Sequence, residues 1–109
     1  WESEDRLFTR RMVDARARHF AHPYLPRQLP RLLRAAGLTL AKADGFTIIE
    51  TRYDPDSFGA GLIGMARDAA VQHGVTTAEA ATWEEDLRSR DVDGEYFFCM
   101  NRFILTATK

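Results

Sequence analysis

The stretch that decides the fold lies near the end of the 109-residue chain and reads EYFFCMNRFILTA, from Glu95 to Ala107. Apolar residues occupy both sides of its alternation, which is typical of a β-strand buried on both faces. In an α/β protein such a strand is central and has helices above and below it. Because a two-stranded ribbon cannot bury both faces, this run predicts sheet neighbours that the remaining residues do not supply.

A second strand is predicted over residues 38–52, where the spacing of apolar residues changes from the helical to the β pattern. Asp44-Gly45 stands in its middle, before the β-rich run Phe46–Ile49. Asp-Gly between two short strands signals a tight hairpin, whereas a bulge at Gly45 within one long strand uses the same glycine. The residues alone leave both interpretations open.

Helical spacing and capping residues predict four helices around these strands. They cover about Glu4–Phe20 with Ser3 as N-cap, about Pro26–Ala36 ended by Gly37, Ser57 to Gly74, and Thr76 to Ser89 opened by a Thr76–Glu79 capping box. In the first helix, the residues at helical spacing that form the predicted inner face are Leu7, Phe8, Met12, Ala15 and His19.

The composition is that of an ordinary globular protein, with 45% hydrophobic and 28% charged residues. A net charge of −1 gives no overall electrostatic reason to expect nucleic acid or an anionic membrane as a partner. The first helix carries an arginine-rich face, which makes nucleic-acid binding a third possibility. Since Asp5 and Asp14 interrupt its positive field, we interpret this face as solvated.

Cysteine and histidine usage argues against a metal site or a disulfide framework. Cys99 is the single cysteine, and no two histidines have metal-ligand spacing on one helix face. No apolar run approaches the roughly 18 residues that span a bilayer, and the start of the chain is unlike a signal peptide, so we expect a soluble, cytoplasmic protein. Trp1 is not an ordinary translated start, and we expect a cut beginning.

Two segments carry a resemblance to a known family. Residues 29–40, LPRLLRAAGLTL, resemble the helix-to-strand step found late in class I S-adenosylmethionine-dependent methyltransferases. Residues 74–87, GVTTAEAATWEEDL, are followed by GEYFF and a β run closing on ATK. This order resembles the tail of many ubiquinone/menaquinone-type small-molecule methyltransferases. The likeness extends from about Leu7 to the last residue.

The resemblance implies that residues 1–109 are the C-terminal portion of a methyltransferase domain, an α/β fragment of a Rossmann-like fold. In that family the sheet has seven strands, and the last, antiparallel strand slots between the fifth and the sixth. The two predicted strands would be the sixth and seventh, a β-hairpin-like antiparallel pair with residues 54–92 as a helical insertion that roofs the substrate pocket. This implication favours one long bulged strand over a hairpin at Asp44-Gly45.

The implied function is methyl transfer from S-adenosylmethionine to a small, fairly apolar acceptor, with these residues on the substrate side. The family's glycine-rich turn and its acidic ribose-binding residue have no counterpart here, so no cofactor-binding residue is assigned and the isolated chain is expected to be inactive. Residues 59–64, GAGLIG, imitate a G-x-G-x-x-G fingerprint but lack the preceding buried strand of a βαβ unit.

His22, in the loop Ala21–Tyr24, is the candidate catalytic base because a base that removes a proton from the acceptor assists methyl transfer. The candidate substrate-binding residues are apolar: Phe58, Leu62 and Met65 on the roofing helix, with Tyr24 and Met100 near the pocket mouth. Plain core packing is the competing interpretation for each of these apolar side chains.

The competing class is a stand-alone α+β module that binds a small apolar ligand or a partner protein and has no enzymatic activity. The free edge of the last strand distinguishes the two. A complete module should protect so apolar an edge, whereas a fragment should pair it with the missing N-terminal part or with another copy. We expect self-association through that edge.

Overall fold

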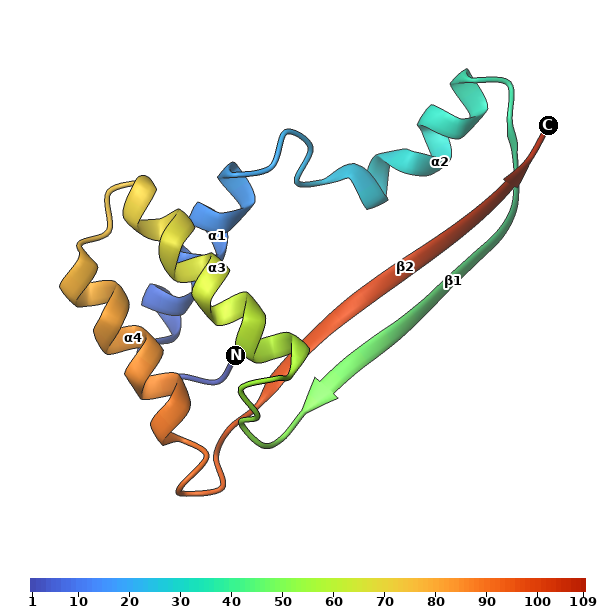
Figure 1. Cartoon of the computed structure of the whole chain (residues 1–109). Helices are drawn as coiled ribbons and strands as arrows, with labels where there is room; N and C mark the ends of the chain where they lie inside the picture. The colour runs from blue at the N-terminus through green and yellow to red at the C-terminus, as the bar shows by residue number, and fades with distance from the viewer. The chain divides into compact units, whose positions relative to one another are not determined.

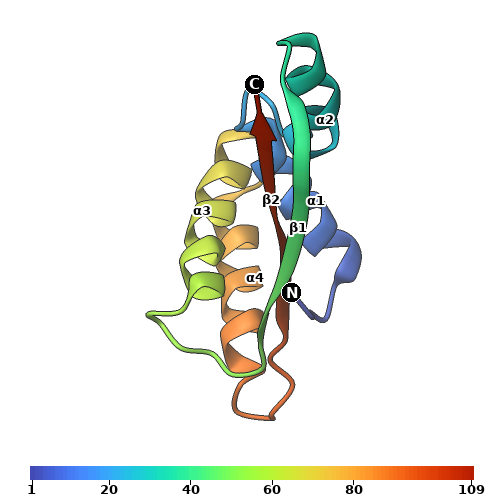
Figure 2. The same ribbon diagram turned by 90° about the vertical axis from the view of Figure 1, so that its right-hand side faces the viewer.

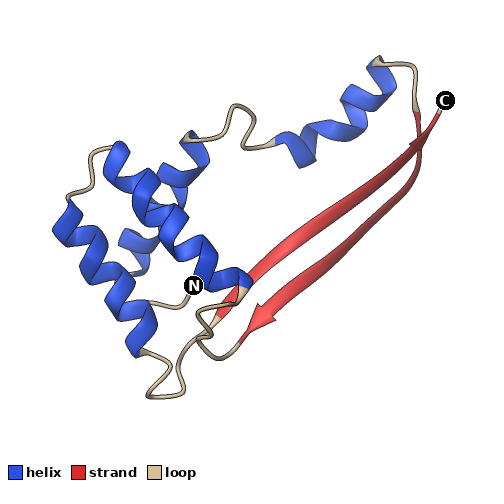
Figure 3. Cartoon of the chain, viewed as in Figure 1, coloured by secondary structure: helices blue, strands red, loops and turns tan.

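The computed structural model describes residues 1–109 as four α-helices and two β-strands (Figures 1 and 3). In chain order these are α1 (Arg6–Arg18), α2 (Leu25–Ala35), β1 (Thr39–Glu50), α3 (Phe58–Gln72), α4 (Thr77–Ser89) and β2 (Phe98–Thr108). The strands form one two-stranded antiparallel sheet. The predicted α/β class, the four helices and the antiparallel pair are therefore confirmed. No helix is long and apolar enough to cross a membrane.

The chain divides into two compact units, each described here by itself. The helical unit comprises Trp1–Ala21 and Ile49–Cys99, and contains α1, α3 and α4. The ribbon unit comprises His22–Ile48 and Met100–Lys109, and contains α2 and most of both strands. The antiparallel strands can be followed side by side in Figures 1 and 2.

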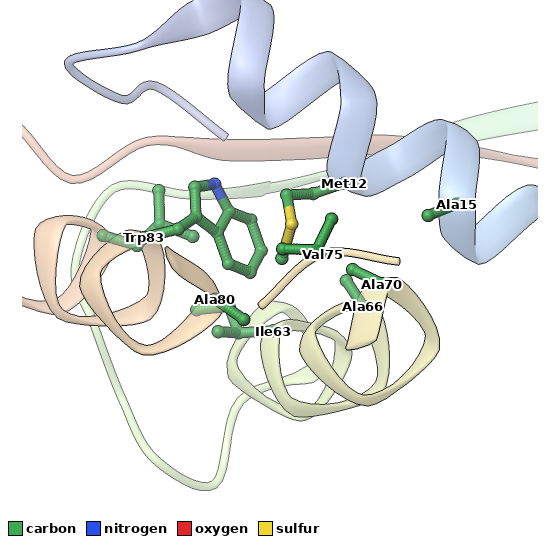
Figure 4. Close-up of a cluster of buried hydrophobic side chains, with 9 residues drawn as sticks. Met12, Ala15, Ile63, Ala66, Ala70, Val75, Ala80 and Trp83 are labelled. Carbon is green, nitrogen blue, oxygen red and sulfur yellow. The ribbon is translucent and has the colours of Figure 1, made fainter. Parts of the chain in front are cut away.

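The helical unit has its own apolar core, in which α3 packs against both α1 and α4. Figure 4 shows Met12 of α1 pointing toward Val75 and toward Trp83 of α4. The Trp83 indole N–H donates a hydrogen bond of 2.8 Å to Thr9 Oγ1, so the buried ring leaves no polar atom unpaired. The core cluster comprises Met12, Ala15, Ile63, Ala66, Ala70, Val75, Ala80, Trp83 and Leu87.

The start of α1 corrects two predictions. Asp5, not Ser3, is the N-cap, and its carboxylate accepts a 2.8 Å hydrogen bond from the Phe8 N–H. Ser3 is buried and its hydroxyl shares a 2.5 Å hydrogen bond with the hydroxyl of Thr9, which removes it from the capping position. Leu7, predicted on the inner face, is 82% exposed. Thr9 takes an inner position instead, because its hydroxyl has partners there.

The ends of α2 and α3 follow the predicted glycine rule. Gly37 and Gly74 have positive φ angles of 77° and 95°, which glycine adopts at little cost. After α3, the Gly74 N–H donates to the Val71 carbonyl and the Val75 N–H donates to the Ala70 carbonyl. This pair of bonds is a Schellman motif, and the buried Val75 side chain anchors the turn in the core.

The start of α4 confirms the predicted capping box, and the start of α3 is capped by Ser57. The Ser57 hydroxyl accepts a 3.2 Å hydrogen bond from the Ala60 N–H. At α4, Thr76 Oγ1 accepts from the Glu79 N–H at 3.2 Å, and the Glu79 carboxylate accepts from the Thr76 N–H at 2.9 Å. Each cap satisfies an N–H group that the helix itself leaves without a partner.

β1 is one continuous strand from Thr39 to Glu50, so the long-strand interpretation is right and a hairpin at Asp44-Gly45 is wrong. Gly45 does not have the left-handed φ of a G1 bulge. A Cβ there would meet the Arg102 carbonyl at 3.4 Å and the Phe103 ring at 3.8 Å. The absent side chain therefore leaves room for Phe103 on the neighbouring strand.

β2 is poorly covered in this chain, although its sequence is apolar on both sides. Phe98, at its start, is buried in the helical unit. Phe103 and Ile104 alternate to opposite faces of the strand, and they are 59% and 52% exposed. The ribbon therefore does not bury both faces of its last strand, as expected for a sheet of two strands.

The capping box of α4 gives a first test of this fold. Thr76→Ala removes the acceptor for the Glu79 N–H, and we expect it to lower the free energy of unfolding by about 1 kcal/mol. Thr77→Ala, at the first residue of the helix, is the matched control and should change stability little. Urea unfolding followed by circular dichroism measures both, and equal effects would contradict the role assigned to Thr76.

Candidate functional site

The best-defined polar arrangement of the chain lies at the start of α3. The Glu50 carboxylate, at the end of β1, accepts hydrogen bonds of 2.9 and 3.2 Å from the Gly59 N–H and one of 2.9 Å from the Ser57 hydroxyl. A carboxylate is favoured here because the N-terminus of a helix carries unpaired N–H groups and a partial positive charge. Glu50 thus links the end of β1 to the start of α3 by hydrogen bonds.

Gly59 is required by this contact. A Cβ at Gly59 would overlap Glu50 Oε2 and would lie 2.8 Å from the Phe98 ring, whereas one at Gly61 or Gly64 would meet nothing within 4 Å. The Gly59 N–H is already bound by Glu50, so the GAGLIG segment does not fit a loop that holds the methionine or phosphate part of a cofactor. One glycine of the segment serves packing between β1, α3 and β2.

An aromatic cluster stands beside this junction, within the helical unit. Trp1 lies edge-on to Trp83, with ring centroids 5.6 Å apart, and lies 5.1 Å from Phe98. Tyr53 and Tyr96 form a second edge-to-face pair at 5.8 Å. Rings at these separations and angles attract one another beyond their area burial, so they pack together as an aromatic wall.

Tyr96 is the most perturbed titratable group of the cluster. Its side chain is buried, and its hydroxyl lies against the Trp1 side chain without a well-formed hydrogen bond. Burial, and secondly the negative charge of Glu50, raise the pKa of Tyr96 to about 12. The phenol therefore stays protonated at neutral pH. Its buried O–H can donate a hydrogen bond, and it is not a base.

The sequence patterns did not point to Glu50, Tyr53 or Tyr96 as residues of the site. They also did not show that the ring of Trp1 makes contacts there. Glu50 is the last residue of a strand, and the signal for its role was a carboxylate placed shortly before a capped, glycine-rich helix. Trp1 was interpreted only as a sign of a cut beginning, yet its ring contacts two core aromatic residues. No local sequence signal identifies such a long-range contact.

The predicted substrate residues on α3 lie along one side of that helix at i, i+4 and i+7. Phe58 is partly exposed and its ring centroid is 6.5 Å from that of Phe98. Leu62 is buried, with 7% exposure, whereas Met65 is 56% exposed. Phe58 and Met65 are therefore open to a ligand in this structure, and Leu62 lies beneath them as part of the packed interior.

The remaining candidates lie in the ribbon unit. Tyr24 is the N-cap of α2 but makes no side-chain capping bond, and the Arg27 guanidinium lies 5.9 Å from the centroid of its ring. The His22 side chain is exposed, and the His22 carbonyl accepts the Leu25 N–H. No contact in the unit assigns a catalytic partner to His22, and its role stays a prediction.

Two adjoining hollows of the ribbon unit contain the other predicted residues. Tyr24 lines a hollow of about 560 Å³ together with prolines of α2 and residues of both strands. Met100 lines one of about 260 Å³ beside Leu29. Pro26, Phe103 and Leu105 line both, so Tyr24 and Met100 border one continuous, mostly apolar surface. His22 lines neither hollow.

Comparison with protein-family models, with curated proteins and with solved structures finds no match for this chain. No group of three or more histidine, cysteine, aspartate or glutamate side chains is placed to hold a metal ion. The site therefore rests on its own geometry: an aromatic wall and a partly exposed face of α3 in one unit, and an apolar surface bordered by Tyr24 and Met100 in the other.

The three glycines of α3 give a test with internal controls. Gly59→Ala should lower the free energy of unfolding by about 1–3 kcal/mol, because the new methyl group overlaps Glu50 and Phe98. Gly61→Ala and Gly64→Ala should each raise it by about 0.5–1 kcal/mol, since alanine favours the helix and has space. The three variants are compared by their denaturant midpoints at unchanged m-value. If Gly59→Ala does not lower the midpoint, Gly59 is not in close contact with Glu50 and Phe98.

The buried phenol of Tyr96 gives a pH test. The unfolded chain ionises this group near pH 10 and the folded chain near 12, so its contribution to stability is fully present below pH 10 and is lost as the pH rises toward 12. We expect the unfolding midpoint to fall over that interval, and to fall less in Tyr96→Phe. Tyrosinate absorbance measured in parallel should show one late-ionising tyrosine that is missing in the variant.

Proposed function

We propose that this chain is the substrate-side part of an S-adenosylmethionine-dependent methyltransferase that acts on a small, fairly apolar acceptor. The cofactor would be held by a part of the sheet outside these residues. The observation that carries the proposal is β2: its sequence is apolar on both faces, it pairs with β1 alone, and its middle is more than half exposed on both sides. Such a strand is suited to the interior of a wider sheet.

The order and direction of the elements support the same proposal. Two helices, α3 and α4, stand between β1 and β2, and the strands are antiparallel. This is the arrangement that the resemblance implies for the sixth and seventh strands with a helical insertion between them. Glu50 and Gly59 join the end of β1 to the start of α3, which gives the insertion a fixed point of attachment.

In this proposal the chain contributes positioning more than chemistry. Methyl transfer requires the acceptor atom to lie in line with the methyl group, and holding that geometry supplies much of the rate. Phe58 and Met65 offer exposed apolar surface for the acceptor on α3, and the buried Leu62 supports them. The candidate base His22 and the apolar Tyr24 and Met100 belong to the ribbon unit, and a part for them in acceptor binding is what the resemblance implies. Phe58 also packs against Phe98 of the aromatic wall, which supports the start of α3.

A radiolabelled-cofactor experiment tests the proposal. The 109-residue chain should neither bind nor turn over S-adenosylmethionine, whereas a longer product of the same gene that adds the preceding residues should bind it and methylate an apolar acceptor. In that longer form, Phe58→Ala should raise KM for the acceptor at least about tenfold and leave cofactor affinity unchanged. Leu7→Ala, at an exposed site, is the control.

Two results would overturn the proposal. One is tight cofactor binding by the 109-residue chain alone, and the other is a folded longer form that does not bind S-adenosylmethionine. An unchanged KM in the Phe58 variant, with activity present, would instead remove α3 from the substrate site and leave the class of enzyme standing.

The second candidate is a stand-alone α+β module that binds a small apolar ligand without catalysis. The hollow of about 560 Å³ beside Tyr24 favours it, because its volume is in the range of small-molecule sites and its lining is mostly apolar. Arg27, whose guanidinium stacks on Tyr24, would then orient an acidic or aromatic ligand. Fluorescence titration with an apolar dye, in the wild type and in Tyr24→Ala, separates this candidate from the first.

A further inference from the structure

The sheet of this chain has two free edges, one on β1 and one on β2. Each free edge presents a row of backbone N–H and C=O groups that pair readily with another strand. Proteins protect such edges with charged residues, glycine or proline, and residues of low β propensity. The two strands of this ribbon differ strongly in that respect.

β1 has the features of a protected edge. Its middle, residues 41–45, reads AKADG, and all four residue types in it are depleted in β-strands. Lys42 and Asp44 form an ion pair of 2.8 Å with both side chains solvent-exposed, so any strand added on this side would lie against charged groups. These residues discourage further pairing along β1.

β2 has none of these features. In its eleven residues, FCMNRFILTAT, Arg102 is the only charged side chain, and there is no glycine or proline. Its aromatic and β-branched residues favour strand structure, and Phe103 and Ile104 expose apolar surface on opposite faces. The free edge of β2 therefore accepts a strand that is apolar on both faces and nearly uncharged.

We propose that this edge binds β2 of a second copy of the chain, in antiparallel orientation, so that two ribbons form a four-stranded sheet with two-fold symmetry. β2 itself meets every requirement of the edge, and an interface between identical surfaces closes into a dimer. The single charge is compatible with self-pairing, because Arg102 faces Arg102 of the other copy only when the two-fold axis passes through that residue.

The dimer follows from the strand edge and not from any cofactor or acceptor, but it uses the edge of β2 that the methyltransferase proposal gives to a further strand. It is therefore proposed for the 109-residue chain, in which that edge is free. Its failure would leave methyl transfer untouched, and a failure of methyl transfer would leave the dimer. A strand added at the edge of β2 would lie beside Phe103 and Ile104 and not over them. The two faces of the sheet, on which these side chains are exposed, would stay open for other contacts.

Charge substitutions designed on the ribbon register test the edge. Thr47 bonds to Asn101 at 2.6 Å and Gly45 lies opposite Phe103, so continuing this pairing places Asp44 opposite Ile104 and Phe46 opposite Arg102. Ile104→Lys and Phe46→Glu therefore each put a charge across from an opposite charge and should leave the ribbon folded. Only the first adds charge to β2.

Sedimentation velocity over a range of protein concentrations should show a monomer–dimer equilibrium for the wild type. Ile104→Lys should raise the dimer dissociation constant at least about tenfold, whereas Phe46→Glu should change it less than about threefold. Circular dichroism confirms that both variants are folded. A monomeric wild type, or dimers weakened equally by both substitutions, would overturn the proposal.

Disulfide trapping gives a second measurement that does not depend on a disruptive variant. In a Cys99→Ser background, cysteines placed one at a time at Phe103, Ile104 and Leu105 sample the middle of β2, and the one nearest the two-fold axis should form covalent dimers on mild oxidation. Phe46→Cys in the same background is the control on β1 and should remain mostly monomeric. Cross-linking that is faster through residue 46 than through any of these β2 positions would assign the interface to β1 and overturn the pairing through β2.

Discussion

The contact of the Glu50 carboxylate with the start of α3 is the interaction on which the helical unit depends. It joins the last residue of β1 to the Gly59 N–H and the Ser57 hydroxyl, and the same glycine lets Phe98, the first residue of β2, approach the helix. Two strands and one helix therefore meet at one residue without a side chain. A charge at a helix terminus, which is usually a small effect, here also fixes the relation of three segments.

Beyond this junction, the helical unit has a closed apolar core of its own. Its core is closed by Met12, Ile63, Trp83 and Leu87, and the indole N–H of Trp83 has a partner in Thr9. Small residues at Ala66, Ala70 and Ala80 allow the helices to approach closely. The ribbon unit has no comparable closure, because no residue of α2 is fully buried and the middle of β2 is exposed. Within one short chain, a complete core and an incomplete sheet coexist.

Much of the fold could be predicted because its signals are local. The capping box at Thr76, the left-handed glycines at 37 and 74, and the β character of residues 98–108 each depend on a few neighbouring residues, and each was found where expected. The residues alone did not decide whether β1 continues through Asp44-Gly45, since the same dipeptide occurs both in hairpin turns and within strands.

The errors and omissions came from contacts across the chain. Ser3 has the right chemistry for a cap, but its hydroxyl is hydrogen-bonded to Thr9, which in turn accepts the Trp83 indole N–H. Asp5 is therefore the N-cap of α1. The same network gives Thr9 an inner position and turns Leu7 outward. Glu50 and Tyr96 could not be assigned because their roles depend on partners distant in sequence. The predicted substrate residues remain hypotheses, since only a bound ligand distinguishes a contact from core packing.

The contrast between the two units bears on function more directly than any single residue does. A stand-alone binding module gains nothing from a long strand that is apolar on both faces and half uncovered, because the exposed surface promotes aggregation. A part of a larger sheet requires that strand, since helices and strands elsewhere would cover it. The protective residues Lys42, Asp44 and Gly45 occur on β1 alone, as expected if β1 is the outer strand of the sheet and β2 an inner one. The asymmetry between the two edges thus supports a position for this ribbon at the border of a wider sheet.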